Sequence, residues 1–283
     1  MAKETDAPKE PGVSKVELTG QTETPDELAG TEATLIEHLT ELRQRLIYSM
    51  LAIAVLFVVC FIFADQIFDF LLEPFKTASG GVEDVRLIFT APQEFFFTKL
   101  KLALFGAVFL AFPILAGQIY AFVAPGLYKN ERGAFLPYLV ATPVFFLIGA
   151  AVMFYGVMPL ALRFFLSMQA GGPDVVTIEM LPRVSEYLSL IMTLTLAFGV
   201  CFQLPVILTL LARIGIVETK QLKSWRKYAF VAVLVVAAFL TPPDPISQLG
   251  LALPMLLLYE LSILSVWLVE RSREKHNETQ PTS

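Results

Sequence analysis

Two glutamates one helical turn apart stand out among the side chains that could bind a charged ligand. Glu37 and Glu41 lie in a polar stretch, residues 34–45, that precedes a long apolar run, and Glu131 lies in a later polar loop. Residues four positions apart on a helix project from the same face. Paired carboxylates at a partly desolvated surface can capture guanidinium groups through parallel hydrogen bonds. We therefore predict a site that fits a ligand with two adjacent arginines.

The same stretch also has an ordinary interpretation. Glu41 and Arg45 form an i, i+4 pair in the favourable order, with the acid first. Arginines that precede an apolar run, such as Arg43 and Arg45, commonly anchor a membrane-spanning helix on its cytoplasmic side. The residues alone leave both interpretations open.

Three further polar residues lie in or beside apolar runs. Glu260 is costly inside a membrane unless it is neutral or paired, although a position near the interface would make it ordinary. Gln203 could bond a polar residue of a partner helix or form a satisfied contact within the bundle. Asp244, in a Thr-Pro-Pro-Asp-Pro turn, is either a helix N-cap or part of a partner contact.

The composition is that of an integral membrane protein. Hydrophobic residues make up 55% of the 283 residues, charged residues only 17%, and the mean hydropathy is +0.65. A soluble domain of this length needs more charged surface. Several apolar runs are long enough to cross about 30 Å of hydrocarbon as helices of roughly 20 residues each. The predicted fold class is an all-α membrane protein.

Catalysis and metal binding have no support in the sequence. Cys60 and Cys201 both lie inside apolar runs and are interpreted as buried small side chains. The sequence contains neither His-Glu-x-x-His nor Gly-x-Ser-x-Gly, and its only histidines are His38 and His276. We predict no enzyme activity, no metal site, no cofactor and no nucleic-acid partner.

Six apolar stretches are predicted to span the membrane within one domain, residues 34–269. They cover residues 47–63, 102–128, 133–162, 187–212, 228–240 and 249–269. A short amphipathic helix at the membrane surface is predicted for residues 66–76, where Pro74 and then Gly80 and Gly81 break it. The connection of residues 167–186 is interpreted as a polar loop.

Both termini are predicted to lie in the cytoplasm of a prokaryote. Lys and Arg near the span ends are about twice as numerous on the side that carries the termini. Residues 1–33, rich in acids, Pro, Thr and Gly, are predicted to form a disordered acidic tail, and residues 270–283 a second disordered tail. Residues 1–33 lack the features of a secretory signal or an organellar transit peptide, which favours the inner membrane.

The last two predicted spans are short. Residues 228–240 extend only about 20 Å at 1.5 Å per residue, and Glu260 interrupts the last span. Bilayer thinning, snorkelling of flanking residues such as Trp225 and Arg226, or a partner helix can accommodate a short span. We predict that this end of the bundle thins the membrane or binds a partner span.

Four motifs occur in order along the chain. They are HLTELRQR at residues 38–45, AFVAPGLYKNER at 121–132, FGVCFQLP at 198–205 and LTPPD at 240–244. Together they resemble the TatC family, the core receptor of the twin-arginine protein translocase. The resemblance covers residues 34–269, nearly the whole membrane portion.

The resemblance implies a six-helix, glove-shaped receptor with a concave face, which binds twin-arginine signal peptides of folded precursor proteins at the cytoplasmic membrane surface. In this interpretation Glu41 and Glu131 receive the arginines, while Arg43 orients the acids or the peptide backbone. The expected signal-peptide site comprises Glu41, Arg43, Glu131, His38, Lys129, Arg132 and Phe122.

The resemblance also implies partners and an energy source. Single-span subunits of the TatA and TatB type, self-association into a multimer and use of the proton-motive force are expected. Many relatives carry Glu where this chain has Gln203, so an ionisable group at this position is not essential here. The intramembrane polar and partner-contact positions are Gln203, Glu260, Asp244 and Pro74.

A small-solute or ion transporter is the alternative function. Gln203, Glu260 and proline-broken helices could line a pathway. The six spans show no evident inverted repeat and few buried charges, which favours the receptor.

Overall fold

The computed structural model of the chain describes residues 25–79, 87–123, 132–168, 170–172, 175–178, 182–241 and 245–278. Most of these residues are helical. In chain order the elements are α1 (Pro25–Ile62), α2 (Ala64–Leu71), α3 (Glu73–Ala78), α4 (Pro92–Val123), α5 (Arg132–Ala151), the π-helical segment η2 (Val152–Val157), α6 (Met158–Ser167), β1 (Ala170–Gly172), β2 (Val175–Ile178), α7 (Val184–Cys201), α8 (Leu204–Arg213), α9 (Thr219–Leu240) and α10 (Pro245–Glu278).

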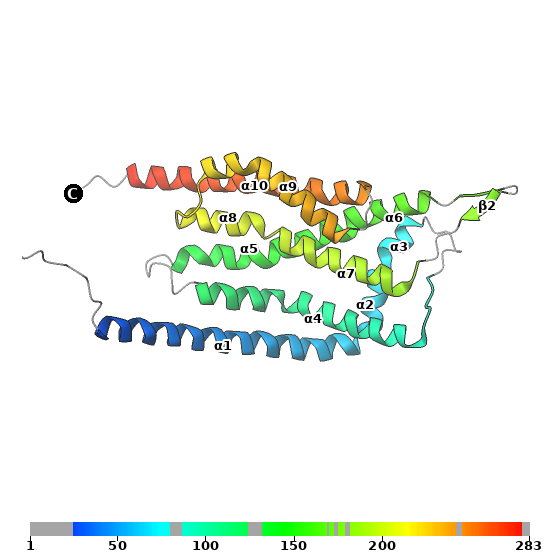
Figure 1. Cartoon of the computed structure of the whole chain (residues 1–283), viewed down its shortest axis with the longest axis horizontal. Coiled ribbons are helices and arrows are strands. Elements are labelled where there is room, and N and C mark those ends of the chain that lie inside the picture. The colour runs from blue at the N-terminus through cyan, green and yellow to red at the C-terminus, as the bar shows by residue number, and fades with distance from the viewer. Residues whose placement is uncertain are drawn as a thin grey trace, which may run out of the picture. The chain divides into compact units, whose positions relative to one another are not determined.

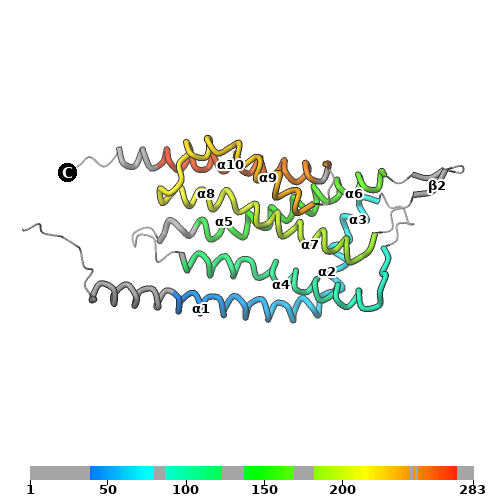
Figure 2. Tube along the Cα trace, in the orientation of Figure 1, coloured from blue at the N-terminus to red at the C-terminus, as the bar shows by residue number. Residues whose placement is uncertain are grey.

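The chain divides into two compact units, Met1–Arg43 and Gln44–Ser283. The described part of the first unit is the opening of α1, residues 25–43. The second unit contains the remainder of α1 and all other described elements. Its long helices run side by side, and α5, η2 and α6 form one continuous pass (Figure 1; Figure 2).

Five helical passes of the described residues are long and apolar enough to cross a membrane. They are Leu39–Ile62, Pro92–Phe122, Pro137–Ser167, Val184–Arg213 and Gln248–Ser272. This confirms the all-α membrane fold class, with one qualifying span fewer than predicted. The remaining pass is α9, whose first half carries Lys220, Lys223, Arg226 and Lys227. The concave shape of the bundle stays a prediction.

The core of the second unit is built around α7. Leu188 and Ile191 of α7 are fully buried against Met153 of η2, Met158 of α6 and Leu251 of α10. Many large apolar side chains instead face outward, as Phe239 does at 87% exposure. Lipid chains are as apolar as these side chains, so their exposure in a bilayer carries no hydrophobic penalty.

Two glycines let α5 and α7 approach closely. A Cβ atom at Gly149 of α5 would lie 2.7 Å from the Phe198 carbonyl oxygen of α7. A Cβ atom at Gly199 of α7 would lie 2.5 Å from the Phe146 ring of α5. Small residues that bring backbones together are typical of packing between membrane helices.

The predicted surface helix at residues 66–76 is two helices. The chain breaks at Leu72 between α2 and α3, and Pro74 lies in the first turn of α3, where its missing N–H costs no helical hydrogen bond. The Tyr187 hydroxyl of α7 donates to the Leu71 carbonyl at 2.8 Å, and the Tyr187 ring meets Phe75 edge-on. These contacts hold α2 and α3 against α7.

The structure adds regular elements in three places where the sequence analysis expected none. Helix α1 begins at Pro25, inside the expected disordered tail of residues 1–33, and α10 continues to Glu278, inside the expected tail of residues 270–283. The loop of residues 167–186 contains the antiparallel strands β1 and β2, with Ala170 opposite Ile178 and Gly172 opposite Val175. Residues 1–24 lie outside the described part of the chain.

Candidate functional site

The acidic stretch and the first span form one uninterrupted helix. Glu41 and Arg43 therefore lie on α1, as predicted. Glu41 is half-buried and Arg43 is exposed, and both belong to the first compact unit. The Arg43 side chain is exposed, so its guanidinium is accessible to a ligand.

Several predicted positions lie outside the described residues. Lys129 and Glu131 fall in the connection between α4 and α5, and Asp244 falls between α9 and α10. The side chains of His38, in α1, and Arg132, the first residue of α5, also lie outside the described part. Phe122 is half-buried in the last turn of α4. The proximity of the Glu41 and Glu131 carboxylates stays a prediction.

Gln203 lies at a break between α7 and α8 and is buried, at 6% exposure. Its backbone N–H turns to the Val200 carbonyl instead of that of Gly199. The Gln203 side-chain amide then donates to the Gly199 carbonyl at 3.2 Å and to the Thr142 carbonyl of α5 at 3.1 Å. The side chain thus replaces a lost helical bond and joins two spans.

A second step extends this polar contact to α4. The Thr142 hydroxyl donates to the Tyr138 carbonyl at 2.9 Å. The Thr142 oxygen in turn accepts a hydrogen bond from the Tyr120 hydroxyl, 2.9 Å away. Gln203, Thr142 and Tyr120 therefore link α7, α5 and α4. This is the satisfied contact within the bundle that the sequence analysis left open for Gln203.

Gln203→Leu is expected to lower the free energy of unfolding by about 1–3 kcal/mol, because it leaves the Gly199 and Thr142 carbonyls without their donor. Chemical unfolding in detergent micelles measures this loss. Ser265→Ala, which removes an exposed hydroxyl on α10, is the control and should change stability little. A Gln203→Leu protein as stable as the parent would contradict this role.

Glu260 is paired rather than isolated. Its carboxylate lies 2.6 Å from the Arg226 guanidinium of α9, and both side chains are about half exposed. The pair joins the two short predicted spans, α9 and α10. Arg226, expected to snorkel, instead has a partner. Glu260 is thus accounted for by an ion pair, which the sequence analysis had allowed.

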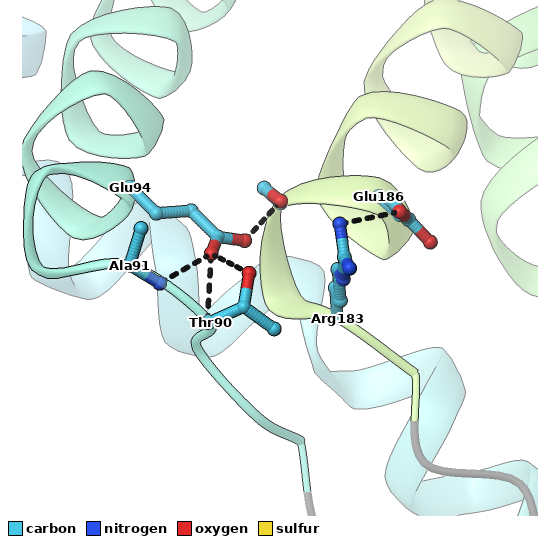
Figure 3. A network of polar contacts seen from close by, with 6 residues as sticks. Thr90, Ala91, Glu94, Arg183 and Glu186 are labelled. Atoms are coloured by element: carbon cyan, nitrogen blue, oxygen red, sulfur yellow. Dashed lines mark hydrogen bonds and ion pairs between the residues drawn. The ribbon is translucent and has the colours of Figure 1, made fainter.

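A polar network at the start of α4 was missed by sequence reasoning. The Glu94 carboxylate accepts hydrogen bonds from the backbone N–H groups of Thr90 and Ala91 and from the Thr90 hydroxyl. It also accepts from the Ser185 hydroxyl at the start of α7 (Figure 3). Glu94 thus joins the first turns of two spans.

The signal for this network was present in the sequence. Pro92 occupies the first position of α4, and Glu94 follows two residues later. A proline at the first helical position and a glutamate at the third are typical of a helix start, where the glutamate reaches back to the capping residue. The partner Ser185 has no such local signal because it is 91 residues away.

Comparisons with known proteins agree on one family. Residues 37–254 match the family described as Sec-independent protein translocase protein (TatC). A relative of that name from Magnetococcus marinus is 46% identical over 249 residues, which are 88% of this chain and 89% of the relative. One from Rickettsia prowazekii is 42% identical over 84% of this chain and 94% of its own length.

A solved structure is similar over nearly its full length. The crystal structure of the twin-arginine translocase receptor TatC aligns with a TM-score of 0.72 and 35% identity, over 82% of this chain and 99% of that one. The family match begins in the acidic stretch of α1 and ends at residue 254, near the start of α10, so it includes every earlier helical pass and the first part of the last. This multi-pass chain of a bacterial inner membrane belongs to the TatC family of Sec-independent protein translocase proteins.

Proposed function

We propose that this chain is the receptor and core component of a twin-arginine translocase, which binds the signal peptides of folded precursors at the cytoplasmic membrane face and nucleates the export complex. The family match carries the proposal, because it begins within the acidic stretch, continues through four qualifying spans and ends in the fifth. The similar solved protein is itself described as a twin-arginine translocase receptor.

Glu41 and Glu131 are the proposed ligands for the two arginines. Arg43, exposed beside Glu41, orients the acids or the peptide backbone. A carboxylate binds a guanidinium through two parallel hydrogen bonds, a geometry that an ammonium group cannot reproduce. Lys129, Arg132, His38 and Phe122 complete the proposed site.

Both termini are proposed to lie in the cytoplasm. The charged first half of α9 supports this orientation, because Lys and Arg are concentrated in cytoplasmic connections. The same orientation brings the acidic stretch of α1 and the connection that carries Glu131 to the cytoplasmic side.

Single-span subunits of the TatA and TatB type are the proposed membrane partners, with further copies of this chain in the same complex and the proton-motive force as energy source. The second half of α9 supports a helix-docking surface. It buries Val233 and Ala237 but exposes Phe230, Val231 and Phe239. A short helix with an exposed apolar face is accommodated well by a partner helix.

A peptide-binding assay tests the proposed function. A labelled twin-arginine signal peptide should bind the chain in lipid nanodiscs at least about tenfold more tightly than a version with two lysines, since the bidentate bonds are lost. Equal binding of the two peptides would refute the receptor. Flux of small solutes through the chain alone in proteoliposomes would instead support the transporter.

A further inference from the structure

A groove of about 540 Å³ lies on the surface of the second unit between α6, α7 and α9. Leu162 and Phe165 of α6 and Leu240 of α9 form much of its apolar wall. Along its other side α7 contributes Glu186, Ser189 and Thr193. These residues are spaced i, i+3 and i+7, so they form a stripe along one helix face. A polar stripe therefore runs into an apolar groove.

The two hydroxyls of this stripe, those of Ser189 and Thr193, are exposed. Ser189 and Thr193 have no hydrogen-bond partner among the residues that the structure describes. By contrast, Thr142 and Ser262 donate to the carbonyl four residues earlier in their helices. Donors that face hydrocarbon without an acceptor are costly. A ligand with acceptor oxygens would satisfy both hydroxyl donors of the stripe.

A pair of opposite charges lies at the rim of the groove, where Glu186 belongs to the lining and Arg183 stands beside it, next to the lining residue Pro182. The Arg183 guanidinium and the Glu186 carboxylate are 3.5 Å apart, and their side chains are 51% and 70% exposed. Most of the donors of Arg183 and one oxygen of Glu186 are therefore available to a ligand. Figure 3 shows this pair at the start of α7, with Arg183 just before the helix and Glu186 in its first turn, beside the Glu94 network.

The rim is fixed by backbone and side-chain bonds. The Val184 N–H donates to the Ile88 carbonyl at 3.1 Å, and the Ile88 N–H donates to the Pro182 carbonyl at 3.2 Å. The Ser185 hydroxyl donates to Glu94 of α4. Because these bonds flank Arg183 on both sides, the backbone that carries the charged pair is held in place before any ligand arrives.

We propose that this groove binds one aminophospholipid, a lipid whose headgroup carries a phosphate and a primary ammonium, from the leaflet beside the start of α7. Its phosphate contacts Arg183 and its ammonium contacts Glu186. Its ester carbonyls accept from Ser189 and Thr193, and an acyl chain lies along Leu162, Phe165, Leu190 and Leu240.

The spacing of the stripe matches the layers of a lipid. Glu186 and Thr193 are separated by about 10 Å along the helix axis at 1.5 Å per residue. The polar interface of each leaflet is roughly 5–7 Å thick, so this distance leads from the headgroup to the first methylenes. A charged rim, then hydroxyls, then apolar walls is the order of chemistry that one phospholipid presents.

A transmembrane helix is a poorer occupant of the groove. Its backbone N–H and C=O groups are already bonded within the helix, so it has no free main-chain acceptor for the two hydroxyls. The Arg183 cation and the Glu186 anion are complementary to the phosphate and the ammonium group of a zwitterionic headgroup. Charge complementarity therefore favours a zwitterionic lipid over an apolar helix.

Native mass spectrometry of the full chain tests this site. The protein, purified in detergent, is mixed with equal amounts of phosphatidylethanolamine, phosphatidylcholine and phosphatidylglycerol. One phosphatidylethanolamine should be retained about tenfold more often than phosphatidylcholine, which has no N–H to donate to Glu186. Equal retention of the three lipids would overturn the proposal.

Variants locate the lipid. Glu186→Gln should abolish the preference for phosphatidylethanolamine over phosphatidylcholine, whereas Ser189→Ala with Thr193→Val should lower retention of all three lipids severalfold. Glu73→Gln is a matched control, because Glu73 and Lys76 form a similarly exposed i, i+3 pair on α3 outside the groove. A preference that survives Glu186→Gln, or is lost equally in Glu73→Gln, contradicts the site.

Two further outcomes separate the lipid from other occupants. A photoreactive residue at position 193 should yield a lipid adduct in nanodiscs, and a protein adduct in its place would point to a helix or a second copy and overturn the proposal. Soluble phosphoethanolamine should not displace the lipid, because the apolar wall contributes to binding. Displacement by the soluble headgroup would also overturn it. Unchanged melting temperatures of the variants confirm that they fold.

Discussion

Glu131→Gln is expected to weaken binding of a twin-arginine signal peptide by at least about tenfold, and Glu41→Gln by a similar factor. A hydrogen bond to a charged group contributes roughly 1.5–3 kcal/mol, and each 1.4 kcal/mol is tenfold in the dissociation constant. Titration of a labelled peptide against the chain in nanodiscs measures both constants. The double variant should lose less than the sum of the two, because both acids hold one peptide.

Asp69→Asn is the control for this prediction. Asp69 is an exposed acid on α2, the helix that follows α1 in the chain. Its replacement removes the same charge without touching the proposed site. A loss of affinity as large in Asp69→Asn as in Glu131→Gln would show that net charge, and not a specific pair of carboxylates, attracts the peptide.

Gly149→Ala should lower the stability of the bundle although it adds only one methyl group. The new Cβ atom would lie 2.7 Å from the Phe198 carbonyl oxygen and within 2.9 Å of two Phe202 side-chain atoms. Because a carbonyl of the facing helix cannot rotate away as a side-chain tip can, α5 and α7 must separate. Overpacking of this kind costs roughly 1–3 kcal/mol. Thermal unfolding in detergent micelles should show a lowered melting temperature.

Gly117→Ala is the matched control for the helix crossing. It makes the same change within α4, where a Cβ atom meets nothing within 4 Å. Alanine is the better helix former by up to about 1 kcal/mol, so this variant should be as stable as the parent or more so. Equal destabilisation by the two substitutions would mean that the crossing of α5 and α7 is not what Gly149 provides.

The sequence predicted the features that depend on local pattern. Apolar length identified five spans that the structure confirms, and the charges of Lys220 to Lys227 indicated that the apolar part of α9 is short. The helical lead-in of Glu41 was predicted because acids and bases at i, i+4 precede an apolar run. Gln203 was recognised as polar within a span, with a contact inside the bundle as one of two interpretations.

Features that depend on distant partners were not predictable in this way. The crossing of Gly149 and Gly199 joins positions fifty residues apart, and the bond from Ser185 to Glu94 joins positions 91 apart. Strands β1 and β2 are only three and four residues long, too short for an alternating pattern to identify. The bond from the Tyr187 hydroxyl to the Leu71 carbonyl, which holds α2 against α7, joins positions 116 apart.

Site-specific photocrosslinking tests the receptor proposal most directly. A photoreactive residue is placed at position 41, and in a second protein at position 131, and each is exposed to a twin-arginine precursor or to its two-lysine version. The proposed site predicts that both positions crosslink to the same short segment around the arginine pair and that the two-lysine precursor gives little product. Crosslinks from only one position, or equal yields from both precursors, would contradict a site formed by Glu41 and Glu131 together.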